Sequence, residues 1–170
     1  MARMPKMLAT LLLVVGCGGP SASRAPAESP GADLTGAWRA TIQFQSGAFA
    51  PIHGLEFMYV FNAGGTMTES SNFDGAPPVP PAYGIWKRTG RNRFEAKYEF
   101  YATKPPAKLE EITKGGGWMP AGRGVFTETI EISEDGSTFT SAIIYKAFDT
   151  SGASVEGGGA ATSRGERLVF

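Results

Sequence analysis

Large apolar residues alternate with polar ones along much of the chain, most clearly within residues 83–101. The second half of this stretch has four apolar residues, each separated from the next by a single charged residue. The apolar residues are Phe94, Ala96, Tyr98 and Phe100. A period of two places successive side chains on opposite faces of a β-strand, so that one face is buried and the other meets water. Residues 89–92 (TGRN) supply the glycine and asparagine that tolerate the positive φ of a hairpin turn. The stretch therefore predicts two antiparallel strands joined by a tight turn.

The same alternation predicts strands on both sides of this hairpin. Before it, we expect a strand opening at Gly36 and two more over residues 55–62 and 66–73. After it, strands are expected over residues 125–133, 138–148 and 154–169, while residues 103–117 allow at most one helical turn near their middle. About eight strands joined mostly by hairpins predict an all-β class with a single closed, antiparallel, up-and-down β-barrel. We place this domain at residues 34–170.

The first 33 residues follow a different pattern. Arg3 and Lys6 precede a short apolar run over residues 8–15, which is too short to span a bilayer and is typical of a secretory signal peptide. Residues 1–16 are therefore predicted to be removed. Residues 17–33 are rich in Gly, Pro, Ser and Ala and hold no large apolar residue, which predicts a disordered linker.

The end of the predicted signal peptide, VVGC at residues 14–17, resembles the bacterial lipobox. The resemblance implies cleavage before Cys17, a diacylglyceryl thioether on its sulfur and acylation, typically with palmitate, of the new amino terminus. Several acyl chains would hold the protein stably on a membrane. Gly18 follows the cysteine where an aspartate would signal inner-membrane retention, so the lipobox rule favours the outer membrane of a two-membrane bacterium. An ordinary secretory signal is the alternative.

Composition limits the chemistry that the chain can carry. Cys17 is the only cysteine and His53 the only histidine, so we expect neither an internal disulfide nor a His-based metal site, and no cofactor. Without Arg3 and Lys6, the 16 basic residues fall to 14 against 16 acidic ones. No extended basic field is available for nucleic acid, which we do not expect as a partner. A Gly-x-Ser-x-Gly elbow is also missing from the sequence.

A Gly36-x-Trp38 pair opens the first strand, and Arg164 and Arg167 lie in the last one. This arrangement resembles the calycin pattern of lipocalins and of small lipocalin-like bacterial proteins. The resemblance implies that Trp38 packs beneath one of the two arginines and closes one end of the barrel. A core tryptophan beside an unrelated arginine is the alternative.

Several aromatic residues fall on the predicted inner faces and are candidates for contacting a ligand: Phe57, Tyr59, Trp86, Tyr98 and Tyr145. Glu128 lies between Phe126 and Ile130 on the same kind of face, so it is a candidate polar anchor or acid/base group. An outward turn at a bulge, or a structural pair with an arginine, is the alternative for Glu128. The rings either line a pocket or fill the barrel completely.

Space for a pocket depends on the small residues opposite these rings. If Thr66, Thr68 and Ser70 of the third strand and residues 157–161 of the eighth face inward, an apolar pocket of about 300 Å³ or more is expected. The preferred function is then an envelope lipoprotein that binds a small hydrophobic ligand. The alternatives are a non-catalytic scaffold or interaction domain with a filled core, and an enzyme of the cyclase or isomerase type by analogy with other barrels. An enzyme would carry a carboxyl group deep in the cavity.

Overall fold

The structure is a computed structural model that describes residues 31–73, 80–108, 110–114 and 116–170. The predicted signal peptide, Cys17 and most of the predicted linker lie outside the described residues. At the end of that linker, the Ala32 backbone N–H donates to Asn92 Oδ1 and the Asp33 carbonyl accepts from Arg167. The last residues of the predicted linker therefore contact the folded domain.

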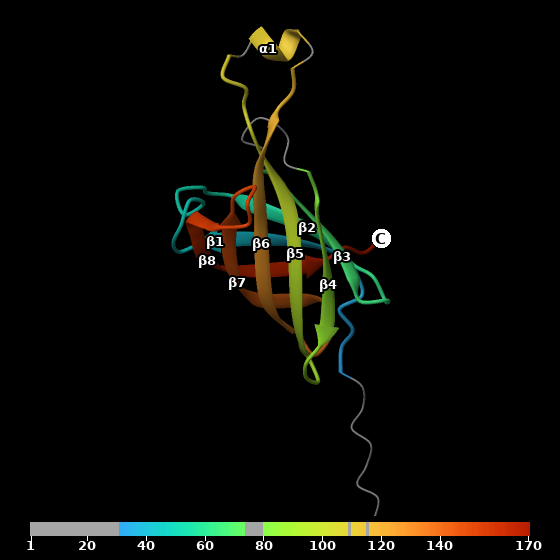
Figure 1. The fold of residues 1–170 in the computed structure, drawn as a ribbon. Coiled ribbons are helices and arrows are strands. Elements are labelled where there is room, and N and C mark those ends of the chain that lie inside the picture. Colours follow the sequence, from blue (N-terminus) through green and yellow to red (C-terminus); the bar gives the residue numbers. More distant parts are fainter. Residues whose placement is uncertain (1–30, 74–79, 109, 115) are drawn as a thin grey trace, which may run out of the picture.

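Eight strands form one closed antiparallel barrel in which each strand pairs with its neighbours in sequence and the last returns to the first (Figure 1). This confirms the predicted all-β, up-and-down barrel. The strands are β1 (Gly36–Phe44), β2 (Leu55–Phe61), β3 (Thr66–Ser71), β4 (Ala82–Arg88), β5 (Arg93–Lys104), β6 (Met119–Ile132), β7 (Thr138–Phe148) and β8 (Ser154–Arg167), with the short helix α1 (Glu110–Thr113) between β5 and β6.

Alternation along each strand places one set of side chains in the barrel interior. In β1 every second residue from Trp38 to Phe44 is buried, and β2 buries Leu55, Phe57, Tyr59 and Phe61 in the same way. Rings fill much of this core, with Tyr98 stacked on Phe126 at 5.0 Å between centroids. Burying one such side chain contributes about 1.5–3 kcal/mol, so the aromatic interior is the main source of stability.

The barrel has two ends, which differ in how the chain covers them. One end, the closed end, carries the start of β1, the end of β8 and the β2–β3, β4–β5 and β6–β7 hairpins. The opposite end, the mouth, carries the β1–β2 loop (residues 45–54) and the β7–β8 turn. The first described residues, drawn in blue, lie at the bottom of Figure 1, away from α1 at its top.

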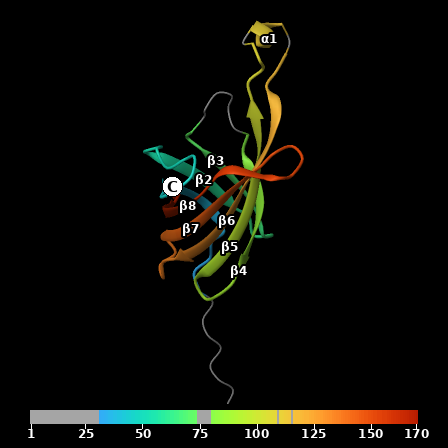
Figure 2. The ribbon, with the colours of Figure 1, turned by 60° about the vertical axis from the view of Figure 1, so that its left-hand side comes forward.

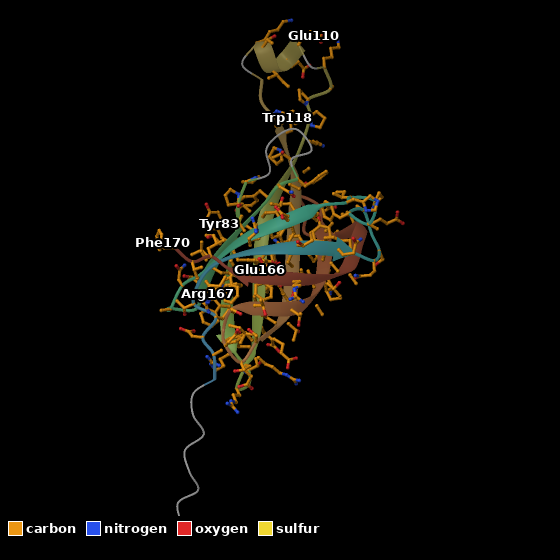
Figure 3. The ribbon with its side chains drawn as sticks, turned by 180° about the vertical axis from the view of Figure 1, so that it is seen from behind. Tyr83, Glu110, Trp118, Glu166, Arg167 and Phe170 are labelled. Atoms are coloured by element: carbon orange, nitrogen blue, oxygen red, sulfur yellow. The ribbon has the colours of Figure 1, made fainter. Side chains whose placement is uncertain are left out.

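An arm extends beyond the mouth, formed by the ends of β5 and β6 and by α1. The two strands stay paired as far as Lys104 and Met119, so β6 begins earlier than the predicted start at Val125. The arm projects from the barrel in both ribbon views (Figures 1 and 2), and Figure 3 places Trp118 along it and Glu110 near its tip. No helix among the described residues is long and apolar enough to cross a bilayer.

A large pocket would require Thr66, Thr68 and Ser70 of β3 to point into the barrel, but in the structure they point outward. β3 turns Met67 and Glu69 into the barrel, whereas Thr66 and Ser70 are exposed and Thr68 is half-buried. Met67 is the one large apolar side chain of this strand, and its burial decides which face points inward. The small polar residues therefore leave no space inside.

The glycine-rich middle of β8 also leaves no room for a ligand, because backbone from the β1–β2 loop occupies it. Gln45 and Ala48 donate their backbone N–H groups to the carbonyls of Ala160 and Gly157, at 2.8 and 3.1 Å. A Cβ atom on Gly159 would collide with the Ser46 carbonyl. The glycines therefore pack against the β1–β2 loop and do not line a cavity.

Candidate functional site

The closed end is built around Trp38, whose side chain is fully buried. Its indole N–H donates to the Leu34 carbonyl at 2.9 Å, and the Phe139 ring meets it edge-on at 5.2 Å. The Arg167 guanidinium carbon lies 4.2 Å from the centre of the Trp38 ring. That distance is within the range of a cation–π contact, which stabilises by about 0.5–2 kcal/mol.

The Arg167 side chain donates hydrogen bonds to backbone carbonyls at this end of the barrel. It donates to Gly136 at 2.8 Å and to Thr35 at 2.6 Å, and it also contacts the Asp33 carbonyl. Figure 3 labels Arg167 and Glu166 together at this side of the barrel. Arg164 is different, because its exposed side chain lies on the outer surface beside Thr41 and Glu56. Of the two candidate arginines, only Arg167 covers Trp38.

A polar network crosses the middle of the barrel and centres on Glu128, which is fully buried. Tyr98 donates to one carboxyl oxygen of Glu128 at 2.9 Å, and Ser141 donates to the other. The Ser141 and Ser163 hydroxyls lie 2.6 Å apart, and those of Tyr59 and Tyr98 lie 3.3 Å apart. Glu128 points inward as the alternation predicted, and hydroxyl groups surround it rather than an arginine.

Burial without a cation raises the pKa values of this network. Removal from water raises the pKa of Glu128, although hydrogen bonds from Ser141 and Tyr98 favour its charged form and limit the rise. Burial, together with the nearby Glu128 charge, raises the pKa values of Tyr59 and Tyr98 well above their ordinary value. The network is therefore a buried structural core in which both tyrosines stay neutral at any physiological pH.

A small pocket of about 70 Å³ opens at the mouth. Its lining is mainly aromatic and contains six phenylalanines: Phe44, Phe49, Phe57, Phe73, Phe100 and Phe126. The other lining residues are Leu55, Glu69, Ser70, Ser71 and Pro80. A pocket of this size holds a few water-sized groups. Its size is well below the pocket expected from the sequence, since β3 and β8 contribute less free space than small side chains suggested.

Phe49 reaches the pocket from the β1–β2 loop, which folds over the mouth. Its ring lies 5.0 Å from Tyr145, 5.2 Å from Phe44 and 6.1 Å from Phe73, measured between centroids. The loop is fixed by its hydrogen bonds to β8, which the glycines at residues 157–159 permit. Phe49 is thus a half-buried ring that lines the pocket from the loop side.

Glu69 supplies the one ionisable side chain in this aromatic lining, among the residues that the structure describes. It is only 6% exposed, and its Oε1 atom has no hydrogen-bond partner. Burial, and then the neighbouring Glu128 charge, raises the pKa of Glu69 to about 8. A buried acceptor without a donor costs about 1–3 kcal/mol, so Glu69 is the one pocket residue among those described whose polar group is left unsatisfied at a cost in stability.

The structure separates the six candidate ligand residues into three places. Phe57 lines the mouth pocket, whereas Tyr59, Tyr98 and Glu128 lie in the buried network. Tyr145 packs against pocket rings at the mouth, 4.9 Å from Phe126. Trp86 lies at the closed end, where its indole N–H donates to the Asn62 and Thr66 carbonyls. The alternation had placed these rings correctly on inner faces, but it could not tell at which depth each one lies.

Several residues of the site were not among the sequence candidates, among them Phe49, Glu69, Ser141 and Ser163. A signal was present for Glu69, because Met67 marks the inner face of β3 and Glu69 follows it by two residues. Ser141 similarly lies between the buried Phe139 and Ile143. No sequence signal identified Phe49, because a loop has no fixed period and its position depends on the β8 glycines.

No protein-family model matches this chain, and no curated protein matches it either. The resemblance to calycins and to lipoproteins accordingly stays a prediction. His53 lies in the β1–β2 loop near the mouth, and it does not line the pocket. Within the described part of the chain, no three His, Cys, Asp or Glu side chains converge on a common metal position.

Proposed function

We propose that this protein is an envelope lipoprotein whose barrel binds a small, mainly apolar ligand at the mouth. The observation that carries the proposal is the aromatic pocket, one of whose lining residues, Glu69, has a buried carboxyl oxygen without a hydrogen-bond partner. Ligand sites combine an apolar lining with a few polar groups that fix orientation, and this pocket has that composition. The remainder of the ligand would lie on the half-buried rings at the rim, such as Phe49 and Phe73.

The ligand test is native mass spectrometry of the protein purified from its own envelope, followed by titration with a neutral, environment-sensitive naphthalene dye. We expect a co-purified ligand mass and a saturable dye response. Ser71→Phe should abolish both, because Ser71 lines the pocket. The matched control is Thr68→Phe, which places the same ring on the opposite face of β3.

Leu55→Phe supplies a second blocking variant should Ser71→Phe fold poorly, since Leu55 also lines the pocket. A ligand-free mass without any dye response in wild-type protein would reject the binding proposal. Dye binding that survives both blocking variants would also reject the pocket as its location.

The membrane location rests on the lipobox-like VVGC and on the solitary Cys17. Cys17→Ser should release the protein into the periplasm or medium, which membrane fractionation measures. A mutant that remains fully anchored would contradict the lipoprotein proposal. The described chain begins at the closed end of the barrel, opposite the mouth.

The second candidate is a scaffold or interaction domain. It is favoured by the small volume of the pocket and by apolar side chains exposed on the outer faces of β2 and β4: Met58, Val60, Tyr83 and Ile85. Val60 and Tyr83 flank Thr68 across β3, so they form a continuous outer row. If the pocket binds nothing, this row is the surface to test next.

The third candidate, an enzyme, gains support from the raised pKa of Glu69 in the lining of the pocket. Acid/base catalysis, however, commonly employs two groups in opposite protonation states. Glu69 is the one ionisable residue among the described lining, and Glu128 lies behind it in the network. Binding is therefore the function that the arrangement supports best.

A further inference from the structure

We propose that the mouth pocket selects a primary ammonium group, and that Glu69 is the anion that receives it. The inference deepens the proposed ligand-binding function and rests on it. It begins from Glu69, a side chain that lines an otherwise aromatic pocket and whose buried Oε1 atom is a hydrogen-bond acceptor without a partner. A ligand that donates a hydrogen bond satisfies this oxygen, and a cationic donor does so most strongly.

Charge around the pocket favours a cation over an anion. Among the described lining residues there is no Lys, Arg or His, and Arg167 is held at the opposite end of the barrel. Glu69 faces Tyr59 on β2, Tyr98 on β5 and Glu128 on β6, and its β4 neighbours Ala82 and Gly84 carry no charge. An anionic ligand would thus enter a region that already holds two carboxyl groups, whereas an ammonium group would neutralise one of them.

The six phenylalanine rings add to this preference, because the face of an aromatic ring attracts a cation that has lost its water. Size then narrows the choice of cation. A pocket of about 70 Å³ accepts a terminal –NH₃⁺ and one or two methylene groups. A trimethylammonium group is larger, and it lacks the N–H donor that Glu69 requires.

Proton release follows from the same arrangement. The pKa of Glu69 is about 8 in the free protein, so below that pH the carboxyl group is largely protonated. Binding a protonated amine as an ion pair expels this proton to solvent, while the amine keeps its own. The apparent affinity should then rise about tenfold for each pH unit up to about pH 8 and level off above it.

The test compares hexylamine, hexanol, hexanoate and hexyltrimethylammonium by isothermal titration calorimetry at about pH 6 and about pH 9. The full chain carries Cys17→Ser, so that no detergent competes for the alkyl probes. We expect hexylamine to bind at least about tenfold more tightly than the other three at the higher pH. At the lower pH, buffers of different ionisation enthalpy should show release of about one proton per hexylamine bound and none for hexanol.

Glu69→Gln should remove both the preference for hexylamine and the proton release, because the amide has nearly the same shape without the charge. The matched control is Glu166→Gln, an exposed carboxylate on β8 that does not line the pocket (Figure 3). The control should leave both measurements unchanged.

The outcomes separate this inference from the proposed function. Equal binding of all four probes, blocked by Ser71→Phe, would overturn the ammonium preference and leave ligand binding intact. Hexyltrimethylammonium that binds as tightly as hexylamine would overturn the requirement for an N–H donor. Absence of binding by every probe, together with a ligand-free native mass, would reject both.

Discussion

At the closed end of the barrel, a charged side chain lies against an aromatic ring, and each of its three guanidinium nitrogens donates a hydrogen bond. Arg167 covers Trp38 and donates to backbone carbonyls of the β6–β7 hairpin and of the segment that precedes β1. At the mouth, Glu69 also lies among aromatic rings, yet its Oε1 atom has no partner. One end therefore stabilises the fold, and the other retains a polar group at an energetic cost that a ligand would offset.

The two ends also differ in what covers them. Hairpins and the paired ends of β1 and β8 surround Trp38, so that its side chain is fully buried. The mouth is covered by a loop whose Phe49 ring is half-buried. Regular pairing fixes the closed end through many backbone bonds, whereas a loop held by a few hydrogen bonds can open at lower cost. We expect mutations at the two ends to separate stability from binding.

The largest expected effect concerns the pH dependence of stability at the mouth. The folded pKa of Glu69 is about 8, above its value of about 4.3 in an unfolded chain. The folded protein therefore binds more protons than the unfolded chain between these values, and its free energy of unfolding should fall as pH rises through this window. The total loss attributable to Glu69 is about 5 kcal/mol, measured by urea denaturation at a series of pH values.

Glu69→Gln should remove this part of the slope. The pKa of Glu128 is also raised, so its contribution has the same sign and remains in both proteins. The difference between wild type and Glu69→Gln thus gives the contribution of Glu69 together with its coupling to Glu128. Parallel pH profiles for the two proteins would contradict the assignment of a raised pKa to this residue.

The next largest effect is expected at the closed end. Trp38→Ala should destabilise the barrel by about 3–5 kcal/mol, because it removes a fully buried ring and its contacts with Phe139 and Arg167. Trp118→Ala is the matched control, since Trp118 lies on the arm outside the core cluster. It should change the free energy of unfolding by less than about 1 kcal/mol. If both variants lost the same free energy of unfolding, the closed end would contribute no more to stability than the arm.

A smaller effect should distinguish the two arginines of β8. Arg167→Lys should cost about 1–2 kcal/mol, because a lysine ammonium cannot reproduce the planar fork that spans several carbonyls and covers Trp38. Arg164→Lys, on the exposed face of the same strand, should be neutral within about 0.5 kcal/mol. Thermal unfolding of the pair measures the difference, and a cost that is larger for Arg164 would refute the assignment.

The smallest change in stability is expected for Phe49→Ala. Its ring is half-buried in a loop, so truncation should cost about 1 kcal/mol and leave the barrel folded. The mouth should nevertheless widen, and stopped-flow mixing should show faster association of the naphthalene dye. Unchanged association kinetics would mean that Phe49 does not limit entry.

Period-two alternation predicted most of the barrel from the sequence alone. The inward faces of β1, β2, β5 and β6 were predicted correctly because each carries several large apolar residues, and burying them leaves only one orientation. Glu128 was placed inside by the same reasoning. β3 was harder, since it has only Met67 to mark its inner face and its remaining residues are small or polar.

Depth along the barrel, and therefore the site itself, depended on strand register and on the loops. Register brings Ser141 beside Ser163 and close to Glu128, and sequence order alone does not specify that offset. It also sends Trp86 to one end and Tyr145 to the other, although both alternate inward. The tertiary structure decided that the β1–β2 loop packs on the glycines of β8 and that Phe49 and Glu69 line the same pocket. Alternation is a local property of one strand, whereas a pocket is the volume left after all strands and loops have packed, so only the assembled barrel could determine it.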